Sequence, residues 1–410
     1  MDAAYRIVAR TLDAGFLDLP WNARLEEWPE ADLVSLERGI SRHVVRFVRV
    51  AGVYYALKEI PQPLAEREYR LLGHLVGTGV PAVEPVGVVS ERRDASGEEL
   101  EPVLVTRYLE YSLPFRTLLA RPVVSAPEPL LAEALAGLLV GLHLTGFFWG
   151  DCSLSNTLFR RDAGVLAAYL VDVETGELHP RLTDGQRTHD LDLAYENLAY
   201  EFYDVASQLG AADERDPTAF ADAVCSGYER LWRDLTEEEV FGRGERDRLH
   251  LRLNELHELG FEAGEMEISS TGAEYRLRAV PARVETGYHR RRLLRLTGLD
   301  AQENQARRLL ADIDAFRDTL VRADERVVSE QAVAGRWLSD VFEPTVNAIP
   351  PELHGKRAAA ELFHELLEHR WFLSERACRE IGLAEALDDY AANVLPAAVD
   401  ERTALLRPRD

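Results

Sequence analysis

The amino-acid sequence predicts an α+β protein, in which a β-rich first part is followed by a mostly helical remainder. Between residues 33 and 60, apolar and polar residues alternate, as they do in strands that bury one face. From residue 127 onward, apolar residues recur mainly at helical spacing. The polar stretch 210–219, which contains glycine and proline, is typical of a linker between two helical parts.

The composition is that of a globular protein with an acidic surface. The 410 residues are enough for two or three domains, and 46% of them are apolar. A net charge of −24 disfavours nucleic acid and anionic membranes as partners. The three cysteines are too widely separated for a disulfide framework or a zinc knuckle, and the N-terminus lacks the pattern of a secretory signal. We therefore expect a cytoplasmic protein.

Lysine is almost absent from the sequence. Lys58 and Lys356 are the only lysines, and every other basic residue apart from histidine is arginine. Codon bias explains the excess of arginine. A lysine that survives such a bias indicates a place where a compact ammonium is needed and the planar fork of arginine does not serve.

The β-rich part is predicted to contain one helix. Pro61 and Pro63 end its third strand, and apolar residues at helical spacing follow. The predicted elements are strands at 32–38, 44–50 and 53–60, a helix at 64–76, and strands at 83–90 and 102–110.

The remainder is predicted to be mostly helical. The longest apolar run, 134–149, contains His143 and is too short to span a bilayer, so we expect a buried helix. The other predicted elements are short strands at 157–161 and 166–174, helices at 187–209 and between 217 and 259, a hairpin at 265–281, and further helices interrupted at 342–353. We divide the chain into residues 1–110, 111–210 and 211–410.

Four polar positions stand in contexts that indicate a shared site. Lys58 lies on the third predicted strand and Glu68 on the helix after it. The pair Asp151 and Asn156 lies in the loop after the apolar helix, in the stretch GFFWGDCSLSN. Asp172 ends the strand AAYLVD. A carboxylate that ends an apolar strand is more typical of a functional group than of a turn residue.

Two of these positions have competitors. The same Asp–Asn spacing recurs within helical segments at 192–197 and 388–393, so the spacing alone is weak. Asp151 differs because a Trp-Gly pair breaks the helix before it and a strand follows. Glu66 competes with Glu68 for the helix position. We favour Glu68, because the leucines three and four residues later place it on the apolar side of the helix.

The order and contexts of these residues resemble the signature set of protein kinases over residues 30–210. Trp-Gly-Asp at 149–151 in place of His-Arg-Asp, and the Asp-x-Glu form at 172–174, are more similar to small-molecule and RIO-type kinases. More narrowly, the chain resembles a bacterial family whose N-terminal half is grouped with the lipopolysaccharide (Kdo/WaaP) kinases and whose C-terminal half is a domain of unknown function. The resemblance implies a two-lobed protein-kinase-like fold with a β-rich N-lobe, an α-rich C-lobe and an α-rich C-terminal domain.

The resemblance also implies roles. Lys58 would pair with the α- and β-phosphates of ATP and would be held by Glu68. Asp151 would accept or orient the proton of the acceptor hydroxyl. Asn156 and Asp172 would hold Mg²⁺, with Glu174 as a candidate further ligand.

Further positions follow from the same resemblance for the rest of the nucleotide. Thr106 matches the residue at the back of the adenine pocket, and the backbone from Arg107 to Leu109 would bind adenine. The glycine-rich loop retains Gly39 alone, which leaves Ser41, Arg42 and their amides as the phosphate cradle.

Two departures from the kinase pattern bear on activity. Trp149 replaces the loop histidine that buttresses the catalytic aspartate. Ser153 stands where protein kinases carry a lysine and many small-molecule kinases a histidine, so a cation beside the transferred phosphate is missing.

Three other features are weighed against plainer interpretations. The arginines around His289 form a basic passage, which we interpret as a helix paired with the chain's carboxylates rather than an RNA or anion site. Asp190 or Asp192 either braces the catalytic loop or begins a solvated helix. Cys152 has no recognisable catalytic partner and is interpreted as structural.

The sequence thus supports two main hypotheses. The first is an ATP- and Mg²⁺-dependent phosphotransferase acting on a hydroxyl of a small molecule, glycan or protein. The second is a pseudokinase whose C-terminal half engages a partner protein. Retention of all four charged positions favours the first, and the missing glycines and Ser153 favour the second. An RNA-associated protein is a distant third, and the identity of the phosphate acceptor stays open.

Overall fold

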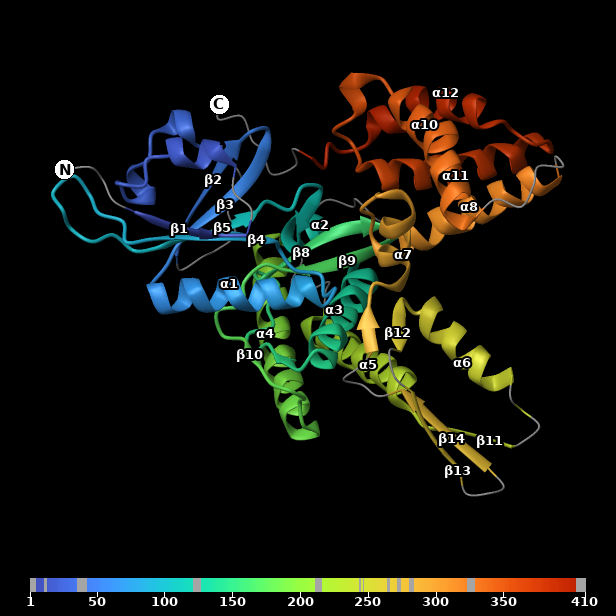
Figure 1. The fold of residues 1–410 in the computed structure, drawn as a ribbon, viewed down its shortest axis with the longest axis horizontal. Helices are drawn as coiled ribbons and strands as arrows, with labels where there is room; N and C mark the ends of the chain where they lie inside the picture. The colour runs from blue at the N-terminus through green and yellow to red at the C-terminus, as the bar shows by residue number, and fades with distance from the viewer. Residues whose placement is uncertain are drawn as a thin grey trace. The chain divides into compact units, whose positions relative to one another are not determined.

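A computed structural model describes residues 5–10, 13–34, 43–120, 127–210, 216–242, 245, 247–263, 266–270, 274–279, 284–322 and 329–402 (Figure 1). The described residues form two compact units. The first contains residues up to 159 together with 168–232, and the second contains 160–167 together with 233–402. The boundary therefore falls within one β-hairpin and, between residues 232 and 233, within the last turns of helix α5 (Pro217–Thr236), rather than in a linker.

The N-terminal part of the first unit is an antiparallel sheet of five strands in the order β1-β4-β5-β3-β2 (Figure 1). Its strands are β1 (Arg6–Ala9), β2 (Val44–Val50), β3 (Val53–Glu59), β4 (Pro85–Ser90) and β5 (Val103–Arg107). The strands predicted at 44–50, 53–60, 83–90 and 102–110 are confirmed, whereas β1 was not predicted. Most of the strand predicted at 32–38 lies outside the described residues, although the Val34 amide donates to the Phe47 carbonyl at 2.8 Å.

An N-terminal segment and helix α1 (Gln62–Gly77) complete this part. The segment contributes the buried side chains of Phe16, Trp21 and Trp28 to a core shared with strands β2 to β5. The buried guanidinium of Arg92 donates to the backbone carbonyls of Trp21 and Ala23, which fixes the segment to the sheet. The helix begins directly after Pro61, a residue that cannot continue a strand ladder but suits a helix start.

The helical part of the first unit carries the residues that follow the sheet. Its helices are α2 (Phe115–Ala120), α3 (Pro127–Leu144), α4 (Asp184–Gln208) and α5 (Pro217–Thr236). Its short strands are β6 (Ser112–Pro114), β7 (Phe147–Phe148), β8 (Thr157–Asp162), β9 (Val165–Leu170) and β10 (Glu177–Leu178), paired in the orders β6-β8-β9 and β10-β7. Strands β8 and β9 cross into the second unit at the hairpin turn.

Helix α3 is the apolar helix that the sequence predicts, with different ends. It begins earlier, at Pro127, and it ends at Leu144, before the aromatic residues that form β7. Its 18 residues meet the length and composition of a membrane span, and it is the one such helix within the described ranges. Of its apolar window, 61% is buried inside the protein, as in a core helix, so it is weak evidence for a span.

Two glycines make the turn out of α3 possible. Gly146 has a φ of +79°, and a Cβ at this position would lie 2.1 Å from the His179 carbonyl oxygen. Gly150, with a φ of +74°, repeats the left-handed conformation just before Asp151. Other residues pay a steric cost in this conformation, so both glycines direct the loop that follows.

The second unit is mainly helical with small sheets. Its helices are α6 (Asp247–Glu258), α7 (Tyr288–Thr297), α8 (Glu303–Arg322), α9 (Glu330–Trp337), α10 (Glu343–Asn347), α11 (Ala359–Ala377) and α12 (Leu383–Asn393). Its strands are β11 (Glu239–Gly242), β12 (Phe261–Ala263), β13 (Met266–Ser270), β14 (Glu274–Ala279) and β15 (Val284–Thr286). The predicted hairpin at 265–281 is present as β13 and β14, but β11, β12 and β15 were not predicted.

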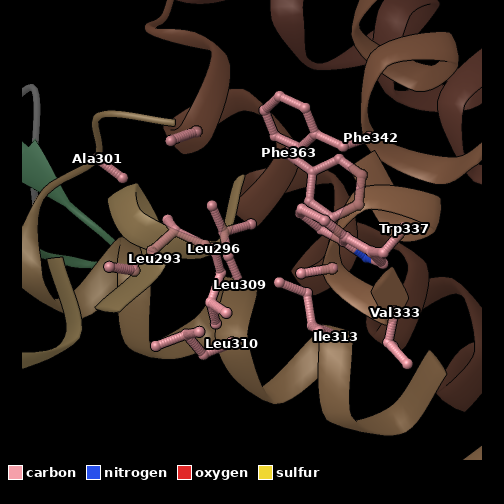
Figure 2. Close-up of a cluster of buried hydrophobic side chains, with 13 residues drawn as sticks. Leu293, Leu296, Ala301, Leu309, Leu310, Ile313, Val333, Trp337, Phe342 and Phe363 are labelled. Atoms are coloured by element: carbon pink, nitrogen blue, oxygen red, sulfur yellow. The ribbon is translucent and has the colours of Figure 1, made fainter. Parts of the chain in front are cut away.

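The core of the second unit is a cluster of leucines and aromatic side chains (Figure 2). Helices α7, α8, α9 and α11 contribute to it, and Trp337 and Phe363 are fully buried there. The chain between α9 and α10 continues as a π-helical turn, Leu338–Phe342, so the interruption predicted at 342–353 begins only after Asn347. Pro344 lies in the first turn of α10, directly after the π-helical turn, and α10 ends at Asn347.

Candidate active site

Three of the four predicted positions meet at the ammonium of Lys58. The Lys58 Nζ donates to Glu68 Oε2 at 3.0 Å and to Asp172 Oδ2 at 2.6 Å. The side chains are enclosed, with exposed fractions of 12% for Lys58, 2% for Glu68 and 27% for Asp172. Glu66, the competing glutamate, instead accepts a hydrogen bond from Gln62 on the exposed side of α1.

Local structure explains why these residues converge. Lys58 lies opposite Leu104 in the β3–β5 ladder, and Glu68 is on the buried side of α1. The end of β9 is attached to the loop before β4, since the Val83 amide donates to the Leu170 carbonyl at 3.0 Å. Asp172 follows this attachment directly and is thereby brought under the five-stranded sheet.

One cation is shared by two carboxylates, and the pKa shifts reflect this imbalance. Burial lowers the pKa of the Lys58 ammonium, but the charges of Glu68 and Asp172 outweigh it and raise that pKa above its ordinary value. Burial raises the pKa of Glu68 to about 7, and the Asp172 charge adds to the increase. Glu68 is therefore the carboxylate that a single ammonium compensates least, because it is the more buried of the two.

Asp151 is held by two neutral amides. The Asn156 Nδ2 donates to Asp151 Oδ2 at 3.2 Å, and the Asn197 Nδ2 donates to Asp151 Oδ1 at 3.2 Å. Asn156 is the predicted partner, whereas Asn197 comes from helix α4 and was not predicted. Both oxygens of the carboxylate are thus oriented before any ligand is present.

Helix α4 supports the catalytic loop along one face. Asp190 accepts hydrogen bonds from the Trp149 amide at 2.7 Å and the Gly150 amide at 2.8 Å. Glu201, further along the helix, accepts from the Ser155 amide at 3.0 Å. Asp190, and not Asp192, is therefore the residue that braces the loop.

The Asp190 carboxylate is itself part of a buried chain of polar groups. It contacts the His143 Nε2 at 3.0 Å, and the His143 Nδ1 contacts the Tyr228 hydroxyl at 2.7 Å. Burial lowers the pKa of His143, which favours the neutral ring. The neutral ring then donates from Nε2 to Asp190 and accepts the Tyr228 proton at Nδ1. This series of hydrogen bonds holds Asp190 in place, and thereby the loop that Asp190 binds.

The groups around Asp172 fit a small divalent cation. The Asp172 Oδ1 accepts the Glu174 amide at 3.0 Å, and Asn156 uses its Nδ2 toward Asp151, which leaves its amide oxygen for another partner. Mg²⁺ prefers such oxygen ligands and is commonly held by few protein groups together with substrate phosphates. Within the described ranges no group of three or more His, Cys, Asp or Glu side chains is arranged to hold a metal ion.

Comparison with known proteins finds two family matches along the chain. Residues 26–219 match the lipopolysaccharide kinase (Kdo/WaaP) family. Residues 230–395 match a domain of unknown function, DUF4032. The α+β fold with a β-rich, kinase-like N-terminal part and a helical remainder, which the sequence predicts, is thereby confirmed.

A solved structure of WaaP in complex with acyl carrier protein is also similar to this chain. The likeness covers 56% of this chain and 98% of the other, with 19% sequence identity and a TM-score of 0.34. No curated protein sequence matches the chain.

Within the region that matches the Kdo/WaaP family, Thr106, Arg107 and Leu109 lie on one stretch of backbone at the end of β5. The Arg107 amide donates to the Glu84 carbonyl at 2.8 Å, and the Leu109 carbonyl accepts the Ser112 hydroxyl at 2.6 Å. An adenine-binding role for this stretch stays a prediction. Gly39 and Ser41, like Arg42, lie outside the described residues.

Glu174, the candidate further metal ligand, is engaged elsewhere. Its Oε2 lies 3.1 Å from the Nε2 of His43. His43 directly follows the segment that would carry the phosphate loop. Its metal-binding role stays a prediction.

The structure explains the two departures from the kinase pattern. Trp149 is fully buried, and its Nε1 has no hydrogen-bond partner among the described residues. The loop is instead held through the Trp149 backbone, whose carbonyl accepts the Thr175 hydroxyl at 3.0 Å. Ser153 is buried, and its hydroxyl accepts the Asn156 amide at 3.2 Å, so it builds the turn and supplies no cation.

The remaining candidates have structural explanations. Arg290, Arg291 and Arg292 form ion pairs with Asp300, Glu262 and Glu330 respectively, as the interpretation of the basic passage expects. Burial raises the pKa of the Cys152 thiol well above its ordinary value, so the thiol is a poor nucleophile.

Three residues near the site were missed by sequence reasoning. Asn197 and Glu201 contact the catalytic loop, and Arg67 donates from its guanidinium to the Gly176 carbonyl at 2.6 Å. A signal for two of them was present, since Asp190, Asn197 and Glu201 have the spacing of one helix face.

Proposed function

We propose that this protein is an ATP- and Mg²⁺-dependent phosphotransferase that moves the γ-phosphoryl group of ATP to a hydroxyl of a small-molecule, glycan or protein acceptor. The observation that carries the proposal is the shared contact of Lys58 with Glu68 and Asp172, at 3.0 and 2.6 Å. Three charged residues from distant segments meet within a domain that matches a kinase family. This arrangement serves the neutralisation and alignment of phosphates on which phosphoryl transfer depends.

The side chains have separable tasks in such a reaction. Lys58, held by Glu68, presents its ammonium to nucleotide phosphates. Asp151 accepts the proton of the acceptor hydroxyl or orients that hydroxyl, because both its oxygens are already fixed by Asn156 and Asn197. Asp172 and Asn156 supply the oxygen ligands for Mg²⁺, which when bound neutralises charge on the phosphates.

The alternative is a pseudokinase that binds nucleotide or a partner protein without transfer. Ser153 favours it, because its buried hydroxyl serves the loop and leaves the usual loop cation without a replacement at that position. Loss of such an electrostatic contact costs orders of magnitude in rate. For either function we propose a cytoplasmic location, in keeping with the free cysteines 152, 225 and 378.

A thermal-shift and ATP-turnover comparison tests the proposal. Mg-ATP at a hundred times its Kd should stabilise the wild type by about 2.7 kcal/mol. Lys58→Met and Asp172→Ala should abolish that stabilisation. The matched control is Lys356→Met, because the ammonium of the other lysine donates to the Ala398 carbonyl in the second unit.

Each outcome separates the hypotheses. Stabilisation that survives both Lys58→Met and Asp172→Ala rules out the proposed nucleotide site. Stabilisation of the wild type without hydrolysis or autophosphorylation favours the pseudokinase.

A further inference from the structure

The turn of the β8–β9 hairpin belongs to the second unit, although its sequence lies within the kinase-family match. At this turn, the side chain of Asp162 is 3% exposed. Its Oδ1 accepts the Gln305 amide at 2.8 Å, and its Oδ2 accepts the Asn304 amide at 3.1 Å and the Asn304 side-chain amide at 3.0 Å. A hairpin residue thus caps the N-terminus of α8, where unpaired amides favour a carboxylate.

A second layer of contacts encloses the turn. The Glu361 Oε2 accepts the Ala163 amide at 3.0 Å and the Gln305 side-chain amide at 2.7 Å. The same Gln305 amide donates to the Arg161 carbonyl at 2.9 Å. Backbone groups on both sides of Asp162 are therefore satisfied by side chains from α8 and α11.

The Arg161 side chain extends this network. Its Nε donates to Glu401, and the Arg357 guanidinium lies 3.1 Å from the same carboxylate. Glu401 is 3% exposed and Arg357 7% exposed. Residues from the hairpin, from before α11 and from the end of the described chain thus share one buried set of ion pairs.

The hydrogen bonds around Asp162 can all be made in only one placement of the turn. Burial raises the pKa of Asp162 to about 6, and its hydrogen bonds to Gln305 and Asn304 oppose the increase. A buried carboxylate is costly unless its hydrogen bonds are made, so small shifts of the turn are penalised. We call the side chains of Asn304, Gln305 and Glu361 around this turn the cage. The cage therefore holds the hairpin in one arrangement.

The two strands of the hairpin lead to the proposed metal ligands. β8 begins at Thr157, directly after Asn156, and β9 ends at Leu170, two positions before Asp172. The strands are hydrogen-bonded neighbours in the sheet β6-β8-β9, so each limits the freedom of the other. The Val171 amide also donates to the Asn156 carbonyl at 3.0 Å, which joins the two ends of the hairpin.

We propose that the DUF4032-containing unit acts on phosphoryl transfer through this hairpin, with Asp162 as a positioning residue for Asn156 and Asp172. The catalytic part of this inference depends on the proposed function above. The structural part does not, because it requires only that release of the turn loosens the two strands as far as their ends. A role is thereby assigned to the helical unit that has no catalytic motif of its own.

Hydrogen–deuterium exchange of the full chain without nucleotide tests the structural part. Asp162→Ala should accelerate exchange of amides in 156–159 and 168–172 by about tenfold, because the strands lose a fixed turn. The matched control is Ile313→Ala, which opens the core in Figure 2 without touching the cage. It should destabilise the helical core but keep the Asn304 and Gln305 contacts to Asp162, so the hairpin ends should exchange as in the wild type.

Metal dependence tests the catalytic part. In Asp162→Ala, the Mg²⁺ concentration needed for half-maximal ATP binding should rise about tenfold, as it does when residues behind metal ligands are removed. ATP binding measured in EDTA should stay at the wild-type level. Asp162→Asn, which keeps one oxygen acceptor but turns an amide toward Asn304, should fall between wild type and alanine.

The outcomes are distinguishable. Equal exchange at the hairpin ends in Asp162→Ala and Ile313→Ala overturns the inference, as does a lowered Tm with unchanged Mg²⁺ dependence. A wild type that binds no Mg-ATP contradicts the proposed function alone, and the exchange comparison then still decides the role of the hairpin. If Asp162→Ala does not fold, Asp162→Asn replaces it in both measurements.

Discussion

The two halves of the candidate active site are built in different ways. What we propose as the nucleotide side is assembled from three distant segments by charge, with Lys58 between Glu68 and Asp172. What we propose as the acceptor side is a loop held mainly by one helix, α4, through amides and backbone hydrogen bonds. The first depends on ionisation, and the second depends on helix geometry.

This difference indicates which changes each half of the site tolerates. Ionic contacts among partly buried groups change with pH and with any ligand that brings its own charge. Hydrogen bonds from neutral amides depend on the position of the donor, and they fail when the donor is removed. Substitutions that separate the two behaviours are therefore the sharpest probes of the site.

Removal of the catalytic carboxylate should have the largest effect. Asp151→Ala should lower kcat by about a thousandfold, because the acceptor hydroxyl loses its proton acceptor, with Mg-ATP affinity close to wild type. Steady-state kinetics together with calorimetric titration of Mg-ATP checks both values. Asp192→Ala, on the exposed side of α4, is the matched control and should change neither. Equal losses of kcat and nucleotide affinity in Asp151→Ala would contradict the division into two halves.

Loss of the brace under the loop should be the next largest effect. The Asp190 carboxylate accepts from three donors, the Trp149 amide, the Gly150 amide and the His143 ring. Asp190→Asn places a side-chain amide opposite these donors. The free energy of unfolding should fall by about 1–3 kcal/mol, as measured by urea denaturation. Asp192→Asn, an exposed change on the same helix, should stay within about 0.5 kcal/mol. Equal stability of the two variants would show that α4 does not hold the loop.

The nucleotide side should respond to pH through Glu68. The pKa of Glu68 is raised to about 7, so Glu68 takes up a proton as pH falls through that value and releases Lys58. Mg-ATP affinity should therefore decrease below pH 7. Glu68→Gln should weaken binding by about tenfold at pH 8 and remove the pH dependence. Glu66→Gln, two residues away and exposed, is the matched control and should keep the wild-type profile.

The same shift has the opposite sign for stability. The folded-state pKa of Glu68 lies above its unfolded value of 4.5, so the folded protein binds the extra proton more tightly. Its favourable contribution is present below pH 4.5 and is lost as pH rises through about 7. Relative to the wild type, Glu68→Gln should therefore gain stability as pH rises. A constant difference between the two would refute the assignment.

The amide from α4 should have the smallest of these effects. Asn197→Ala should lower kcat by about tenfold or less with KM unchanged, because Asp151 keeps its bond from Asn156 but loses its second donor. Tyr200→Ala, an exposed neighbour on α4, is the control for changes in the helix. An increased KM in Asn197→Ala would place Asn197 on the nucleotide side and weaken the comparison.

The ionic half of the site is more visible in the sequence than the amide half. A lysine on a strand and a carboxylate at a strand end interrupt apolar patterns, so Lys58 and Asp172 were recognisable without coordinates. Asn197 was hidden because its contact to Asp151 spans 46 residues. Its spacing from Asp192 resembled a chance match. Only the packing of α4 against the loop distinguishes it.

The fold, like the site, was predictable only in part. Alternating strands and the apolar helix follow from local periodicity, and most of them are present with shifted ends. β1 pairs with β4, which lies more than seventy positions away, and its pattern is too short to be recognised alone. Asp162 is a comparable case, because its burial depends on α8 over 142 residues. Such long-range contacts leave no periodic signal.

The close approach of Lys58 to Asp172 has a consequence for how the site would take up a charged ligand. The chain supplies a counter-ion for this ammonium, so Lys58 carries no uncompensated positive charge. In the proposed function, a nucleotide phosphate would replace Asp172 at the ammonium, and the released carboxylate would become available to the metal. A ligand that brings an anion and a cation together, as Mg-ATP does, would satisfy the ammonium and the carboxylate at the same time.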